Sequence, residues 1–127
     1  YGTVIVTLAD EDKEEALPLV RRFYNMGFNI EATTMTAQFL KEHGIRTRVR
    51  RKISEGSEEI LDSIRAGYVS YVINTRAILS GVHYEDGAKI RRCALENGVT
   101  MLTALDTVKV LLDVLEEMTI GISTINA

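Results

Sequence analysis

Three threonine hydroxyls lie within four residues of one another, on Thr33, Thr34 and Thr36. Apolar and polar residues alternate from Phe28 to Ala32, which is typical of a strand, and apolar residues at helical spacing follow Thr36. Thr33 or Thr34 is therefore expected to cap a helix. A helix N-terminus presents unpaired backbone N–H groups and the positive end of the helix dipole. The segment predicts an anion site, most naturally for a phosphate; the alternative is a helix whose cap is purely structural.

The elements that must position this segment follow from the hydrophobic pattern. Apolar and β-branched runs predict strands at residues 3–8, 28–32, 45–49, 68–74 and 99–102. Apolar residues at helical spacing predict helices at about residues 16–24, 36–42, 58–66, 88–97 and 108–118. Glycines follow the first four of these helices and are expected to end them, at Gly27, Gly44, Gly67 and Gly98.

The first predicted helix carries conflicting signals. Pro18 argues against a regular helix there, unless it lies in an early turn or at a kink. Asp10 or Asp12 is expected to cap this helix, because acidic side chains favour a helix N-terminus.

Two other segments have no clear periodicity. Residues 75–87 are expected to form an excursion broken at Gly81 and Gly87. Residues 119–127 are expected to be partly disordered.

Composition narrows the class of protein. The chain has 127 residues, 46% of them hydrophobic, which suits one domain with a real core. A net charge of -3 does not favour general nucleic-acid binding. Cys93 has no partner for an internal disulfide, which fits a cytoplasmic location, and no apolar run is long enough to span a membrane. The chain starts at Tyr1 without a methionine, so we expect residues 1–127 to be a single domain taken from a longer protein.

Alternation of five strands with about five helices predicts an α/β fold with three layers, α/β/α. The sheet is expected to be five-stranded and mostly parallel, with right-handed crossovers, in the manner of Rossmann-like folds. Ligands of such sheets bind beyond the carboxyl ends of the strands, near the point where the strand order reverses.

Polar side chains of the kinds that bind phosphate gather at these predicted strand ends. Lysines and an arginine supply charge, and hydroxyls and an amide supply hydrogen-bond donors. The predicted effector or phosphate site comprises Thr7, Lys13, Thr33, Thr34, Thr36, Lys52, Asn74, Thr75 and Arg76, and Thr103 follows the last strand.

Other possible sites are weaker. Five of the seven residues at 46–52 are basic, and Arg46, Arg48 and Arg50 would share one face of a strand. This stripe could contact nucleic acid, an effector phosphate or a parent protein, but no aromatic residue is interleaved for base stacking, and a solvated edge strand guarded by charge is the simpler interpretation. His43 and His83 have no convincing third ligand, so no metal site is expected.

Several of these segments together resemble a known family. They are Asp12-Lys13, residues 31–37, residues 52–56, residues 71–75, residues 90–92 and Ala94-Leu95. In this order and spacing they are similar to the C-terminal allosteric domain of the large subunit of carbamoyl-phosphate synthetase, a domain with the methylglyoxal-synthase-like fold. The resemblance implies a five-stranded parallel sheet, helices on both sides, and the first and fourth strands adjacent at its centre.

The resemblance also implies a nucleotide site. Six residues match the family's phosphate-binding positions: Lys13, Thr33, Thr36, Lys52, Asn74 and Thr75. Thr7 stands where the family often has serine, Thr34-Met35 replaces the more frequent His-Gly, and Arg76 stands where a small polar residue can occur. Thr103 matches part of the family's ornithine site and is a possible second effector site.

The implied function is allosteric control of carbamoyl-phosphate synthesis from glutamine and ATP, for pyrimidine and arginine biosynthesis. Uridine monophosphate (UMP) would inhibit, and phosphoribosyl pyrophosphate (PRPP) or inosine monophosphate (IMP) would activate. The pattern Asp86-Gly87 with residues 90–92 and 105–107 looks more like pyrimidine-specific forms. The implied partners are the rest of the large subunit and, through it, the small glutaminase subunit. The parent ligase would use ATP with Mg or Mn, whereas the isolated domain would need no cofactor and catalyse nothing.

An enzyme with the same fold is the alternative. Methylglyoxal synthase abstracts a proton from a phosphorylated triose with a carboxylate, and its Gly-Gly-Asp motif aligns with Glu55-Gly56-Ser57. Ser57 cannot act unaided as a general base near neutral pH, and it is expected instead to cap the helix at 58–66.

Overall fold

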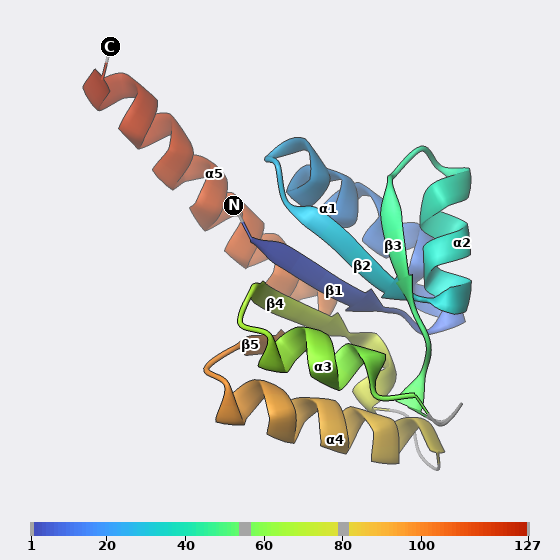
Figure 1. Cartoon of the computed structure of the whole chain (residues 1–127). Helices are drawn as coiled ribbons and strands as arrows, with labels where there is room; N and C mark the ends of the chain where they lie inside the picture. Colours follow the sequence, from blue (N-terminus) through green and yellow to red (C-terminus); the bar gives the residue numbers. More distant parts are fainter. Residues whose placement is uncertain (1, 54–56, 79–81, 127) are drawn as a thin grey trace.

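Strands and helices alternate along residues 2–53, 57–78 and 82–126, which the computed structural model describes (Figure 1). The strands are β1 (Thr3–Thr7), β2 (Asn29–Thr33), β3 (Thr47–Arg50), β4 (Val69–Asn74) and β5 (Thr100–Leu102). The α-helices are α1 (Lys13–Asn25), α2 (Thr34–Glu42), α3 (Glu59–Arg65), α4 (Val82–Glu96) and α5 (Leu105–Asn126). Two short 3-10 helices, η1 (Asp10–Asp12) and η3 (Thr75–Ile78), follow β1 and β4.

The five strands form one parallel sheet in the order β3-β2-β1-β4-β5. Its central strand, β1, is buried along its whole length, as the β-branched run at residues 3–8 predicts. The first and fourth strands pair directly, with Thr7 opposite Asn74. The predicted five-stranded parallel sheet is therefore confirmed, and the strand order reverses between β1 and β4.

Helices cover both faces of the sheet and complete the predicted three layers. One face packs against α1, α2 and α5, through buried residues such as Phe23, Leu40 and Leu112. The other face packs against α3 and α4, where Ile5 and Val72 of the sheet meet Ile60. Figure 1 shows α3 and α4 on the side of the sheet opposite α1 and α5.

The end of α1 shows how the chain enters the second strand. Gly27 has φ 101°, which favours glycine, and it ends the helix as predicted. Its N–H donates to the Tyr24 carbonyl oxygen, and the Phe28 N–H donates to the Phe23 carbonyl oxygen, both at 3.1 Å. The rings of Phe23 and Phe28 meet edge to face with their centroids 5.3 Å apart. Phe28 therefore packs against the end of α1, and β2 begins at the next residue, Asn29.

Two expectations about α1 are wrong. The helix continues through Pro18, whose side chain is exposed, while Ala16, Val20 and Phe23 on the other face are buried and hold the helix in place. No side chain caps it, because Asp12 at the N-cap makes no such hydrogen bond and Asp10 pairs with Lys13.

Three boundaries also differ from the predicted ones. β3 starts at Thr47 because the Ile45 N–H closes the end of α2, donating to the Leu40 carbonyl oxygen at 3.0 Å. α4 starts at Val82, so Gly87 lies buried inside a helix and breaks nothing; Gly81 falls outside the described residues. α5 continues to Asn126, where partial disorder was expected. No helix in the described ranges is long and apolar enough to cross a membrane.

Candidate functional site

A small cavity lies at the carboxyl end of the sheet, where the strand order reverses. Five of the predicted site residues line it: Thr7, Thr33, Lys52, Asn74 and Arg76. Thr7, Thr33 and Asn74 end strands β1, β2 and β4, Lys52 follows β3, and Arg76 lies in η3. The parallel sheet thus brings together residues that are up to 69 positions apart in the sequence, because the carboxyl ends of its strands meet at one edge.

Threonine hydroxyls form a buried cluster on one side of this cavity. Thr33 Oγ1 lies 3.3 Å from both Thr7 Oγ1 and Thr36 Oγ1. Thr36 Oγ1 also accepts a hydrogen bond from the Leu8 N–H at 3.2 Å. Thr36 therefore ties the start of α2 to the end of β1, and Thr7 and Thr33 are the members of the cluster that line the cavity.

The threonines at the start of α2 do not cap it as predicted. Thr33 occupies the N-cap position, but its side chain makes no capping hydrogen bond and turns toward Thr7 and Thr36. The Thr34 side chain is exposed and makes no such bond either. Because the first N–H groups of a helix have no intrahelical acceptor, they remain donors for an anion at this end of α2.

On the other side of the cavity, Asn74 and Thr75 hold the loops in place. Thr75 Oγ1 accepts the Ala9 N–H at 2.8 Å. Asn74 Oδ1 accepts the Arg76 N–H at 3.1 Å, so the side-chain NH2 group is the part of Asn74 that can donate to a ligand. Both residues are buried, and Thr75 does not line the cavity.

Charges of both signs surround the cavity. Lys13 is ion-paired with Asp10 at 2.8 Å and does not line the cavity. The hydrogen bond and charge of Lys13 lower the pKa of the Asp10 carboxyl, with smaller contributions from Arg76 and Lys52. Asp86 lines the cavity from the first turns of α4, and sequence reasoning missed it because the predicted helix began two residues later, at Ala88.

The remaining predicted positions lie outside this cavity. Thr34 is exposed at the start of α2, and Thr103 is half-buried after β5 without lining the cavity. The space between the lining residues is about 20 Å³, which holds no more than a water molecule. A phosphate group is larger than this space, so its binding inside the cavity would require lining side chains to move.

Comparison with known proteins identifies the fold family. Residues 15–103 match the family model described as the MGS-like domain.

The chain belongs to the MGS-like domain family.

The structure of this MGS-like domain also resembles a solved one, the crystal structure of methylglyoxal synthase from Elizabethkingia anophelis NUHP1. The TM-score is 0.67 at 17% sequence identity, and the match covers 87% of this chain and 76% of that chain. At this level of identity the likeness establishes a shared fold.

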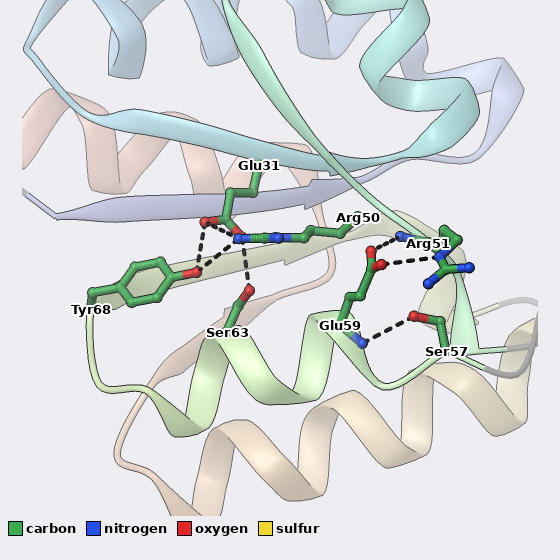
Figure 2. A network of polar contacts seen from close by, with 7 residues as sticks. All are labelled: Glu31, Arg50, Arg51, Ser57, Glu59, Ser63 and Tyr68. Carbon is green, nitrogen blue, oxygen red and sulfur yellow. Dashed lines mark hydrogen bonds and ion pairs between the residues drawn. The ribbon is translucent and has the colours of Figure 1, made fainter.

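A network of polar contacts holds Arg50 and Arg51, the two residues that precede Lys52 in the sequence (Figure 2). Arg50 Nε donates to Glu31 Oε1 at 2.9 Å, and Ser63 Oγ and Tyr68 Oη donate to the same carboxylate at 2.9 and 2.8 Å. Arg51 donates to Glu59 through its backbone N–H and its guanidinium. Arg50 and Arg51, the two residues before Lys52, are thus held in place by Glu31 and Glu59.

Glu31 is the network's central residue, and sequence reasoning missed its role. It is one of the polar residues that alternate with apolar ones in β2, but its side chain is only 3% exposed. Burial works against its charge, but hydrogen bonds from Arg50, Tyr68 and Ser63 outweigh burial and hold the pKa of the Glu31 carboxyl below its ordinary value. The sequence did contain a signal for this role: a carboxylate in the middle of one predicted strand, next to another predicted strand rich in arginine.

Ser57 does not occupy the predicted cap position, because the N-cap of α3 is Glu58 and no side chain caps this helix. Ser57 Oγ accepts the Glu59 N–H at 3.1 Å, at the start of α3. Glu55 and Gly56, which align with the rest of the Gly-Gly-Asp motif of methylglyoxal synthase, lie outside the described residues.

Proposed function

We propose that this MGS-like domain is a regulatory module that binds a nucleotide monophosphate or a related phosphate ester at the carboxyl end of its sheet. One observation carries the proposal: Lys52 and Arg76 meet the hydroxyl and amide donors of Thr33 and Asn74 around one cavity. Two cations with neutral donors are the groups that bind phosphate in proteins.

Each residue has a distinct part in this proposal. Lys52 and Arg76 supply charge, Thr33 and the first amides of α2 donate to the phosphate, and the Asn74 amide contacts the ribose or base side. Lys13 would approach the phosphate by leaving Asp10, to which it is paired at 2.8 Å. Thr36 and Thr75 hold the loops in register, since their hydroxyls already accept backbone N–H groups.

The parent protein in this proposal is the large subunit of a carbamoyl-phosphate synthetase. Support comes from the motif resemblance, above all residues 31–37 and 71–75, and from membership of the MGS-like family. UMP would inhibit and PRPP or IMP would activate ATP-dependent synthesis elsewhere in the large subunit, with ammonia from a glutaminase subunit. Because the cavity must open to admit phosphate, binding can bias the conformation of the domain; such coupling is typically worth about 1–3 kcal/mol.

A second candidate is a lyase acting on a phosphorylated triose, and Asp86 is the observation that favours it. A carboxylate in the same cavity as Lys52 could remove a proton next to a carbonyl while the lysine held the phosphate. Against it, Ser57 stands where the synthase motif has its aspartate. Incubation with dihydroxyacetone phosphate separates the two candidates: the regulatory proposal expects no methylglyoxal, and steady turnover would replace it with the lyase.

Calorimetric titration with UMP tests the regulatory proposal, with IMP, PRPP and ornithine run beside it. We expect saturable binding of UMP, and a loss of about tenfold or more in affinity in Lys52→Ala, because one phosphate contact is removed. Lys41→Ala is the matched control, since Lys41 is exposed in the last turn of α2, the end opposite the cavity. Equal affinity in Lys52→Ala and Lys41→Ala would contradict the proposed site.

A further inference from the structure

A second and larger cavity lies at the opposite end of the sheet. This basal cavity has a volume of about 700 Å³ and is lined at the amino ends of β1, β2 and β3 by residues that include Thr3, Asn29, Glu31, Arg46, Arg48 and Tyr68. Its volume falls within the range of about 300–1,000 Å³ that is typical of small-molecule sites. None of the residues that line the carboxyl-end cavity lines this one.

The cavity lies where β2 and β3 receive no apolar cover from α3 and α4, and its lining also reaches Tyr24, Phe28 and Ile30 of the cluster beside α1. Ile5, Glu31 and Arg48 lie side by side on β1, β2 and β3, so their side chains share the face that carries α3 and α4. The buried apolar cluster under these helices takes its sheet residues from β1 and β4, and none from β2 or β3. The side chains that β2 and β3 carry on this face are therefore polar, and β3 is an edge strand of the sheet (Figure 1).

The charges at the basal cavity do not balance. The Glu31 carboxylate is matched by Arg50, which pairs with it at 2.9 Å. Arg46 and Arg48 are exposed, and neither guanidinium has an ion pair or hydrogen bond within the described ranges, in contrast to Arg50. Two uncompensated cations thus stand at the rim of one cavity on a chain whose net charge is -3.

We propose that the basal cavity binds a small organic oxyanion, a phosphate or a carboxylate carried on an apolar or aromatic body. Arg48 lies in β3 and Arg46 directly precedes this strand, so in extended backbone their Cα atoms are about 6.6 Å apart. Two flexible guanidinium side chains that start this close together can reach one oxyanion. The rings of Tyr24 and Tyr68 line the same cavity and offer apolar surface to the rest of the ligand.

The wall of the cavity is fixed before any ligand arrives. Tyr68 Oη donates to Glu31 at 2.8 Å and accepts from Arg50 at 3.3 Å, so its ring, 39% exposed, is held at the cavity (Figure 2). A preformed wall reduces the entropy lost on binding. Unlike the carboxyl-end cavity, this one needs no opening to admit a phosphate or carboxylate.

Amide NMR of the 15N-labelled chain tests the proposal, because it locates binding residue by residue. The probes are phenyl phosphate and benzoate, with benzyl alcohol as the neutral control. We expect saturable shifts at the amides of Asn29, Glu31, Thr47 and Tyr68 with at least one of the two anions, and none with benzyl alcohol. The anion that binds more tightly identifies the ligand as a phosphate ester or a carboxylate.

Two paired variants decide the role of the arginines. Arg46→Gln with Arg48→Gln should weaken the binding at least about tenfold, since two charged donors are lost. Arg91→Gln with Arg92→Gln removes the same charge from an exposed position on α4 and should leave binding unchanged. Lys52→Ala should also leave it unchanged, which separates this cavity from the proposed effector site. Absence of shifts with both anions, or full binding in the Arg46/Arg48 variant, would overturn the proposal.

Discussion

The Arg50 guanidinium donates to the Glu31 carboxylate at 2.9 Å, and this pair joins β3 to β2 two residues before Lys52. The Glu31 side chain is 3% exposed, so its charge is compensated inside the protein. Arg51 is then held by Glu59, and the next residue is Lys52 at the cavity. The pair therefore fixes the segment that delivers the main cation of the proposed phosphate site.

Glu31→Gln should destabilise the domain by about 2–3 kcal/mol, because Arg50 loses the charge that compensates it in a buried setting. Urea unfolding measures the change. Glu59→Gln is the matched control: it breaks an ion pair whose arginine, Arg51, is 68% exposed, and such pairs are worth about 1 kcal/mol or less. Equal losses in the two variants would show that Glu31 contributes no more than a surface pair.

The same carboxylate should make stability depend on pH. Its pKa is held below the ordinary value of 4.5, so the unfolded state binds the proton more readily. The contribution of Glu31 is complete above that value and is lost as the pH falls through the lower pKa of the folded state. Urea midpoints from about pH 6 to about pH 3 should therefore fall more steeply in the wild type than in Glu31→Gln. Parallel curves would contradict the assignment.

Thr75→Val should cost about 1–3 kcal/mol, because the buried Ala9 N–H loses its acceptor at 2.8 Å. Thermal unfolding measures this loss. Thr34→Val makes the same chemical change at an exposed position and should stay within about 0.5 kcal/mol of the wild type. If the two variants are equally stable, Thr75 does not hold the loop after β1.

Asp86→Asn distinguishes the two candidate functions. In the regulatory proposal the change removes a negative charge from the cavity that holds Lys52, and UMP should bind about threefold to tenfold more tightly. Calorimetry measures the affinity. In the lyase alternative the wild type forms methylglyoxal from dihydroxyacetone phosphate and Asp86→Asn does not. Weaker UMP binding in Asp86→Asn would count against the regulatory account of this residue.

The carboxyl-end cavity could be predicted to a large extent because of one property of parallel sheets. Once the strands were recognised, Thr7, Thr33 and Asn74 had to meet at one edge, and they do. Which of the neighbouring side chains face the cavity could not be derived in this way. Lys13 turns to Asp10 and the Thr33 hydroxyl turns to Thr7, because local partners compete with a ligand for the same groups.

The burial of Glu31 and the start of α4 could not be predicted, because both depend on contacts with distant parts of the chain. Glu31 alternates with the apolar residues of β2, and it lies beside Ile5 on the face away from α1, α2 and α5. Its burial comes from Arg50, Ser63 and Tyr68, which approach from other parts of the chain. The true start of α4 was hidden by Gly87, whose helix propensity is poor but which is buried against the rest of the fold.

The position of the phosphate group in a crystal structure of this MGS-like domain with UMP tests the central claim most directly. The account predicts that the phosphate lies at about 3 Å from Lys52 Nζ and from the first amides of α2. It also predicts that Lys52 and Arg76 have moved outward from the cavity of about 20 Å³. A structure with bound UMP but no phosphate beside Lys52 and the first amides of α2, with the carboxyl-end cavity still closed, would contradict this claim.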